Sequence, residues 1–461
     1  MKDIVKKMNT ARSMPPKVLM VCAIKFTKRR IRRYTLKFHP IKLSDNNFLK
    51  ATGYKTIDEI LNRRSPFFFN PNDKDKIVET IRNEYPESIE QTINDADEIC
   101  NHIFDLLGSG KVKLGEEIDW HLDFKSGFRW NPRTYYLGTR KHVTLDDDSD
   151  VKIPWELSRC QHFVTLGKAY WYIKESKMQN EKSKIDGEKY AREFVNQISD
   201  WIDANPVELG VNWACTMDVA IRAVNWLWGY HFFCDSPSLT NEFKLKFFKS
   251  LFLHGRHIIN NLEFGQIRGN HYLSDIASLV YLGILFHETK EGQKWLEKGL
   301  SALKEEMKVQ VYPDGVNCEG SISYHRLVTE LFLSTTLICI KNGLTSPQWY
   351  MTRLEKMIEF VMYYTKPDGT APQLGDNDDG RLHILSNYGN RNRLDHRYLL
   401  SVGAVMFKRG DFKETAGEFH EEAFWLLGEG GLSIYKGSID YYMKEYEGEI
   451  YANIRRSGKG S

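Results

Sequence analysis

The chain of 461 residues lacks the cysteine spacing that builds disulfide frameworks and structural zinc sites. Its cysteines are scattered, odd in number and without a Cys-x-x-Cys pair: Cys22, Cys100, Cys160, Cys215, Cys234, Cys318 and Cys339. Both kinds of site depend on regular cysteine spacing. The sequence also contains no phosphate-binding loop and no nucleophile elbow. We therefore predict no metal ion and no cofactor.

The chain also has no large excess of positive or negative charge. Lys and Arg number 64 and Asp and Glu number 61, so the formal net charge is only +3. Proteins that bind the nucleic-acid backbone carry a basic surplus, so the balance predicts no nucleic-acid partner. One basic run, residues 25–33, departs from this balance. Such a run is most often a solvated helix face, and contact with a polyanion or an anionic membrane is the alternative.

Long hydrophobic runs are absent, and no stretch approaches the length of a transmembrane helix. Residues 18–24 form a short apolar patch. Basic residues follow this patch, and a cleavage site of small residues is absent. This pattern differs from that of a signal peptide. The lack of an export signal predicts a cytoplasmic location, with a periplasmic or secreted location as the alternative. No feature of the sequence indicates an oligomeric state.

Aromatic residues, by contrast, are frequent, at 13% of the chain. Residues 111–150 combine many of them with Gly, Pro and charges, which predicts a long loop, and long loops are often functional. Aromatic side chains either fill a core or stack on sugar rings. Four of them are candidates for substrate binding: Trp120, Trp130, Tyr135 and Tyr136.

The periodicity of apolar residues predicts helices from about residue 46 onward. Helix follows helix with short turns over residues 154–343, and a further helix is expected at 348–364. Beyond residue 420 the pattern changes to short β-prone segments, at 424–427, 431–435 and 450–454. We therefore divide the chain into a basic N-terminal arm (1–45), a helical domain (46–415) and the start of an incomplete β domain (416–461).

A first motif, residues 268–272, places Asn270 and His271 at the start of an apolar helical run. Asn at such a position is most often an N-cap, and His271 could be an ordinary hydrogen-bonded histidine. The functional interpretation uses the same geometry, because a helix N-terminus stabilises an anion. A carboxylate bound there would be stabilised as it gained negative charge.

A second motif, residues 314–325, places Tyr324 and His325 at the start of the next long apolar run. Tyr324 could be a packed ring with a locally bonded hydroxyl. Alternatively, the turn at 319–321 holds Tyr324 at the rim of a cleft, where Tyr and His can move protons. A phenolate base requires a lowered pKa, which His271 or His325 could supply.

Two further groups of polar residues leave alternatives open. Asp218, Arg222 and Asn225 lie on one face of a predicted helix. Either Asp218 and Arg222 form a structural ion pair, or the three side chains line a cleft. Residues 375–381 include Asp376 and Asp378, and their spacing differs from that of an EF-hand, which favours a tight acidic turn.

At these residues the sequence resembles the heparinase II/III-like polysaccharide lyases, which include alginate lyase relatives. The matching stretches follow the family's order: Val151–Arg159, Gly210–Trp213, Met217–Arg222, Arg268–Leu273, Asp314–His325 and Gln373–Asp376. The resemblance implies a mainly α fold, an incomplete (α/α) toroid of helical hairpins. It also implies a following antiparallel β-sandwich domain, of which this chain holds the first strands.

The resemblance further implies β-elimination on an acidic, uronic-acid-containing polysaccharide. Asn270 matches the family's Asn and would hold the uronate carboxylate, with His271 beside it, and Tyr324 matches the Tyr acid/base. Three further residues are candidates for substrate contacts: Arg159, Arg222 and His325. Many members carry another catalytic His in a His-Gly-His-like motif of the β domain. Because this chain ends before such a motif, we expect a truncated chain whose activity depends on the missing histidine.

Two rival functions stay open from the residues. The first is a glycoside hydrolase on an (α/α) toroid, with Glu319 and either Asp376 or Asp378 as the carboxylate pair. The second is a non-catalytic, polysaccharide-binding remnant of a lyase.

Overall fold

The computed structural model describes residues 20, 24, 27, 30–36, 39–61, 65–139, 147–174, 186–265, 268–389 and 391–437. Within these ranges, two short strands, β1 (Ile103–Phe104) and β2 (Val112–Lys113), pair antiparallel, and helices dominate the rest. The part of the chain that the structure describes contains no helix long and apolar enough to span a membrane. The predicted mainly α fold is confirmed.

Four long helices form the inner layer of the fold, and each contacts the next in chain order. They are α9 (Phe163–Lys174), α11 (Thr216–Phe233), α13 (Asn270–Leu285) and α15 (Ile322–Lys341). Their sequences are apolar around most of the circumference, and every residue of α11 is buried. This pattern is typical of a helix enclosed by other helices.

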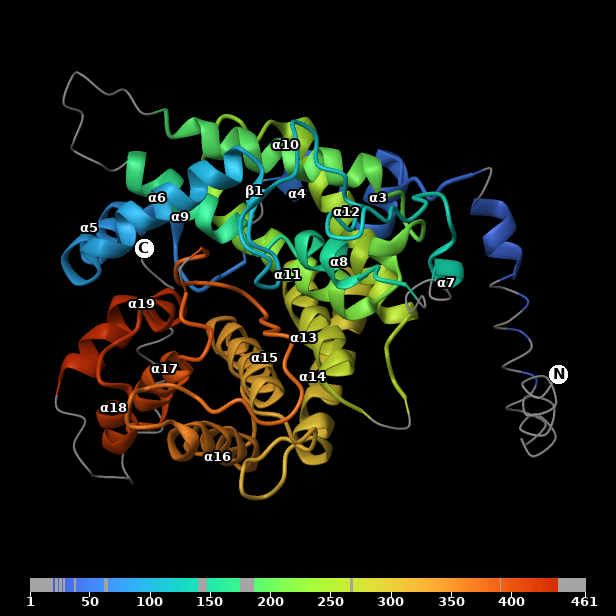
Figure 1. The fold of residues 1–461 in the computed structure, drawn as a ribbon. Coiled ribbons are helices and arrows are strands. Elements are labelled where there is room, and N and C mark those ends of the chain that lie inside the picture. The colour runs from blue at the N-terminus through green and yellow to red at the C-terminus, as the bar shows by residue number, and fades with distance from the viewer. Residues whose placement is uncertain are drawn as a thin grey trace.

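An outer helix follows each inner helix and packs against it. The outer helices are α10 (Glu188–Ala204), α12 (Asn241–Asn260), α14 (Lys290–Val309) and α16 (Gln348–Tyr364). Thr240 and Thr289 cap the starts of α12 and α14 by accepting a backbone N–H. Stacked hairpins of this kind, with an inner and an outer helix each, form the (α/α) toroid that the resemblance implied (Figure 1).

Shorter helices precede and follow these hairpins. They are α3 (Asp45–Thr52), α4 (Ile57–Leu61), α5 (Lys74–Glu84), α6 (Pro86–Cys100), α7 (Tyr136–Thr139), α8 (Lys152–Ser158), α17 (Arg397–Phe407), α18 (Gly410–Ala416) and α19 (Glu421–Lys436). Of the basic arm, residues 30–36 are helical, and Arg32 forms a two-pronged ion pair with Glu208 at 2.5 and 2.7 Å. A contact of this arm with a polyanion stays a prediction.

An extended segment, residues 381–385, lies among the inner helices. Its carbonyl groups accept hydrogen bonds from three buried side chains: Gln161 to Arg381 (2.6 Å), Lys168 to Leu385 (3.0 Å) and Asn225 to Leu382 (2.9 Å). Buried backbone groups need such partners. Asn225 on α11 is therefore structural, which decides one of the alternatives left open by the sequence.

The strands predicted at 424–427 and 431–435 are wrong, because both segments belong to α19. Gly428 has non-helical angles (φ 71°, ψ −166°) and divides α19 into two short pieces, each apolar enough to look like a strand. Figure 1 shows α19 beside α5, against the helical domain. The segment at 450–454 lies outside the described residues, and the domain boundary near 416 stays a prediction.

Replacing Lys168 with Ala is expected to destabilise the fold by about 3–5 kcal/mol, because it leaves the carboxylate of Glu421 buried without its cationic partner. Lys168 on α9 is fully buried and forms an ion pair with Glu421 on α19. Urea unfolding measures the loss. Lys189→Ala is the control, since its ion pair with Asp97 is about one-third exposed and should contribute at most about 1 kcal/mol. Equal effects of the two substitutions would contradict the buried contact.

Candidate active site

Asn270 is the first residue of α13, and its N–H groups donate hydrogen bonds to the carboxylate of Glu319. Its backbone N–H donates to Glu319 Oε1 (2.9 Å), and its side-chain Nδ2 donates to Glu319 Oε2 (2.8 Å). Gly269 in front of it is extended. The negative charge of Glu319 therefore lies at the positive end of the helix dipole. The sequence predicted a carboxylate at this place, and in the structure the carboxylate is that of Glu319.

Tyr324 lies in the first turn of α15, which Ser321 caps through a hydrogen bond to the backbone N–H of Tyr324. Its hydroxyl donates to Asp376 Oδ2 (3.2 Å). Burial and the nearby carboxylates of Asp378 and Asp376 raise the pKa of Tyr324. The carboxylate of Glu319 acts in the same direction. The phenol is therefore held in its protonated form, contrary to the lowered pKa that the sequence suggested.

Glu319 connects the two motifs. Its carboxylate is hydrogen-bonded to Asn270 and is near enough to Tyr324 to raise the pKa of the phenol. The fold therefore brings Asn270 and Tyr324 into one neighbourhood, although 54 positions separate them in the chain.

His271 follows Asn270 and is the exposed member of this group, with 55% of its side chain accessible. Its Nδ1 lies 2.6 Å from Glu263 Oε2. A carboxylate only accepts, so Nδ1 carries the hydrogen and Nε2 holds the lone pair of the neutral ring. Burial lowers the pKa of His271, but the hydrogen bond to Glu263 outweighs it, so the pKa is raised overall.

A network of ion pairs lies beside His271. Arg159 Nε donates to Asp218 Oδ1 (2.7 Å), and its Nη1 donates to Glu156 Oε2 (2.7 Å). Burial opposes the charge of Arg159, but the carboxylates of Glu156 and Asp218 raise its pKa overall. Lys152, half exposed, lies 3.7 Å from Asp378. Arg159 thus reaches the neighbourhood of the predicted site, and Lys152 adds a cation that sequence reasoning did not single out.

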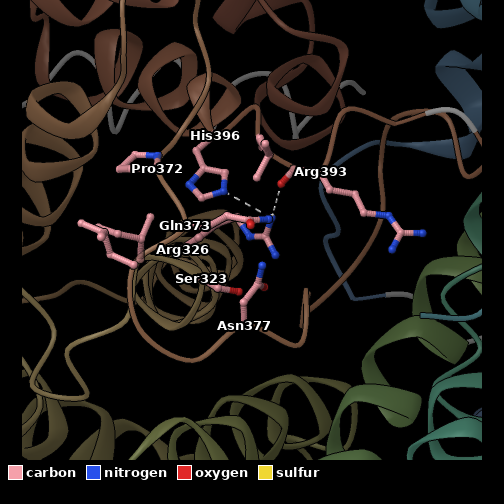
Figure 2. Close-up of a pocket in the computed structure, with 10 residues that line it drawn as sticks. Ser323, Arg326, Pro372, Gln373, Asn377, Arg393 and His396 are labelled. Atoms are coloured by element: carbon pink, nitrogen blue, oxygen red, sulfur yellow. Dashed lines mark hydrogen bonds between the residues drawn. The ribbon is translucent and has the colours of Figure 1, made fainter. Parts of the chain in front are cut away.

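A small pocket lies between the start of α15 and residues 372–377 (Figure 2). Arg326 lies in this pocket, with hydrogen bonds to the carbonyl of Arg393 (3.0 Å) and to His396 (3.4 Å). Its Nη2 also donates to Asp379 (2.9 Å). These bonds fix the loop that carries Asp376 relative to the helix that carries Tyr324.

The four aromatic residues predicted to stack on sugar rings are buried instead. Trp120 donates from Nε1 to Asp200 (2.6 Å), Trp130 packs on Phe128, and Tyr135 and Tyr136 pack edge to face. All four are less than 9% exposed. They pack inside the protein, which is the alternative that the sequence left open.

Arg222 and His325 are also buried, and their polar atoms are engaged inside the protein. The guanidinium of Arg222 stacks 4.0 Å from the ring of Trp201, and burial lowers its pKa to about 9. Asp218, its predicted partner, is bound to Arg159 instead. His325 accepts from the backbone N–H of Asn317 and donates to the carbonyl of Met357, and burial lowers its pKa to about 4.

Sequence reasoning missed two residues of the segment before α13. Glu263 binds the imidazole, but nothing in the sequence pairs positions 263 and 271. Phe264 is 61% exposed, and its ring packs edge to face on Tyr272 at 5.1 Å and lies 5.3 Å from the guanidinium of Arg268. The sequence predicted an exposed aromatic surface for sugar stacking within residues 111–150. In the structure, Phe264 offers such an exposed ring.

The heparinase II/III N-terminus family model matches residues 59–394, a range that contains Asn270, His271 and Tyr324. The chain belongs to this family. The heparin-sulfate lyase of Bacteroides stercoris is 29% identical over 327 residues, 65% of this chain and 43% of the relative. The heparin-sulfate lyase of Pedobacter heparinus is 28% identical over 234 residues, 49% of this chain and 33% of the relative. The chain thus spans less than half the length of these relatives.

Solved structures with partial similarity carry related names. The heparinase III-BT4657 gene product has a TM-score of 0.47 and 25% identity, over 71% of this chain and 46% of that one. Heparan sulfate lyase HepC from Pedobacter heparinus has a TM-score of 0.46 and 25% identity, over 71% of this chain and 45% of that one. The family assignment rests on the sequence match.

Proposed function

We propose that this chain carries the helical part of a polysaccharide lyase that cleaves uronic-acid-containing chains by β-elimination, with heparan-type polymers as the substrate class. The observation that supports it most is the arrangement around Asn270. An exposed imidazole with a carboxylate partner lies next to the amide in the chain, and a protonated phenol shares the Glu319 neighbourhood with it. The heparin-sulfate lyases similar to this chain support the substrate class.

In the proposed reaction, His271 Nε2 takes the proton from C5 of the uronate. The C5–H electron pair forms the C4–C5 double bond, the C4–O4 bond breaks, and the departing O4 takes the proton of the Tyr324 hydroxyl. The proton held by His271 returns through solvent to the phenolate. The bound Glu263 keeps the hydrogen on Nδ1 and leaves Nε2 as the base. The raised pKa keeps Tyr324 protonated, so that a proton is present when O4 departs.

Asn270 would hold the uronate carboxylate. Glu319 accepts one hydrogen of the Asn270 Nδ2 group and fixes the amide, and an amide nitrogen has a second hydrogen to donate. Carbanion-like charge develops on this carboxylate in the transition state, where a preorganised donor stabilises it most. Lys152 is half exposed and pairs with Asp378, whose carboxylate lies near Tyr324. We propose that the positive charge of Lys152 attracts the acidic polymer to the site.

A hydrolase that uses Glu319 and an aspartate fits this geometry less well. Both oxygens of Glu319 are engaged by Asn270, and Asp376 accepts the hydroxyl of Tyr324. Membership of the heparinase II/III N-terminus family also favours a lyase.

In this proposal His271 supplies the base, in place of the β-domain histidine that the resemblance implied, so the reaction can be tested on the chain as it stands. The purified chain is tested on heparan sulfate, alginate and an uncharged glucan. A lyase forms a C4–C5 double bond, so ultraviolet absorbance should rise with heparan sulfate, and the products should carry one unsaturated end. Chain shortening without this absorbance would indicate a hydrolase. Tight binding of heparan sulfate without any shortening would indicate a binding module.

Replacing Phe264 with Ala is expected to raise KM for heparan sulfate roughly fivefold and to leave kcat nearly unchanged. Covering part of the ring with a sugar contributes about 1 kcal/mol to binding in ground and transition states alike. Trp349→Ala is the control. Trp349 is also exposed, but it is the second residue of α16. The next residue, Tyr350, packs on Phe332, eight positions along α15 from Tyr324. An unchanged KM in the Phe264 variant would remove this residue from the binding surface.

A further inference from the structure

Three potential metal ligands meet beside Asn270. Cys215, Glu263 and His271 each offer one ligand atom, and these atoms lie within 4.8 Å of one another. The residues come from the N-cap of α11, the segment before α13 and the first turn of α13. No local motif joins them, so the spacing of ligands in the sequence contained no sign of the group.

The distances resemble the edges of a zinc tetrahedron. Cys215 Sγ lies 3.7 Å from His271 Nδ1 and 3.8 Å from Glu263 Oε2. Ligand atoms about 2.0–2.3 Å from a tetrahedral zinc ion are about 3.3–3.6 Å apart. The third edge, from His271 Nδ1 to Glu263 Oε2, is 2.6 Å because a hydrogen bond spans it. Exchange of that hydrogen for a metal ion requires this edge to lengthen by about 0.7 Å.

Neighbouring groups fix the positions of Cys215 and Glu263, whereas the side chain of His271 can move. Cys215 is buried, and the second oxygen of Glu263 is 3.4 Å from the backbone N–H of Thr216. The backbone N–H of Glu263 donates to the buried Asp275 (2.7 Å). Contacts of this kind orient metal ligands. The His271 side chain is the exposed one, so it can shift and leave the fourth coordination position open to water.

We propose that Cys215, Glu263 and His271 form a binding site for a divalent transition-metal ion of the zinc class. Thiolate, imidazole and carboxylate together select such an ion over Mg²⁺ or Ca²⁺, which prefer oxygen ligands alone. Three protein ligands plus water is the arrangement of an accessible site rather than a closed structural one.

Occupation of the site would change what His271 can do, and this consequence rests on the proposed function. A metal ion on Nδ1 replaces the hydrogen bond to Glu263 and leaves the ring hydrogen on Nε2. Nε2 is then a donor and no longer accepts the C5 proton. The ion would therefore act as an inhibitor of the elimination.

The site is tested first by binding, without substrate. Titration of the full chain with Co²⁺ should give thiolate-to-cobalt charge-transfer absorption that saturates at one ion per chain, and Zn²⁺ should displace it. Cys215→Ser should abolish this absorption, and Glu263→Gln should weaken Co²⁺ binding at least about tenfold. Cys234→Ser is the matched control, because Cys234 caps the opposite end of α11. Absence of the absorption in the parent chain, or its persistence in Cys215→Ser, overturns the site.

A second measurement separates the site from the proposed activity. Stoichiometric Zn²⁺ should suppress ultraviolet-detected elimination in the parent chain and in Cys234→Ser, and a chelator should restore it. Cys215→Ser should keep its activity in the presence of Zn²⁺. Cobalt binding without inhibition would refute the inhibitory role and leave the site standing. Failure to bind cobalt in an active chain would refute the site and leave the lyase function standing.

Discussion

Replacing Tyr324 with Phe is expected to lower kcat on heparan sulfate by about 10²–10⁴-fold, the range for loss of a general acid or base. KM should change less than about twofold, because Phe keeps the ring and removes only the hydroxyl that donates to Asp376. The protonated state of the phenol, favoured by burial and by Asp378 and Asp376, makes this hydroxyl the proton source for O4.

The measurement is the initial rate of ultraviolet absorbance over a range of substrate concentrations. Tyr312→Phe is the matched control, since it removes the hydroxyl of an exposed tyrosine from the same 310–325 region. A Tyr324 variant that retains near-normal elimination would make this residue a packing residue. A loss that appears only in KM would assign to it substrate binding instead of proton transfer.

Helix positions and the two motifs were predictable because they depend on local patterns. The helix expected at 348–364 is α16 with the same bounds, since its apolar residues recur at helical spacing. Asn270 and Tyr324 were singled out as residues at helix starts, and both lie in the first turn of their helices. Their meeting through Glu319 was not visible in the sequence, because it depends on how two hairpins stack.

The contacts that the sequence left open or did not reveal share a dependence on distant partners. Trp120 is a core residue because Asp200, eighty positions away, accepts its N–H. Asp218 binds Arg159 from another helix in preference to Arg222 four positions away, since Arg222 is directed between Trp201 and His254. Glu263, which binds His271, is itself held by Asp275 through its backbone N–H. Spacing along one helix cannot reveal which of several partners a buried charge will meet.

Replacing His271 with Ala is expected to lower kcat by about 10²–10⁴-fold through loss of the base that takes the C5 proton. The fold should tolerate the change, because the side chain is exposed and the Glu263 carboxylate bound to its ring is itself accessible to solvent in part. The space left on the surface should admit free imidazole. Added imidazole should therefore restore part of the elimination rate in a saturable manner, and buffers of similar pKa but larger size should not.

His287→Ala is the control for this experiment. His287 follows the C-terminal end of α13, whereas His271 lies in the first turn of the same helix, and the two side chains are similarly exposed, at 53% and 55%. Loss of activity in the His271 variant alone, with rescue by imidazole, would assign the base to this ring. A loss without rescue would indicate that His271 positions the uronate carboxylate beside Asn270. A near-normal rate would move the base to a histidine elsewhere in the lyase, since neither Tyr324 as a protonated phenol nor the bound Glu319 is free to accept the C5 proton.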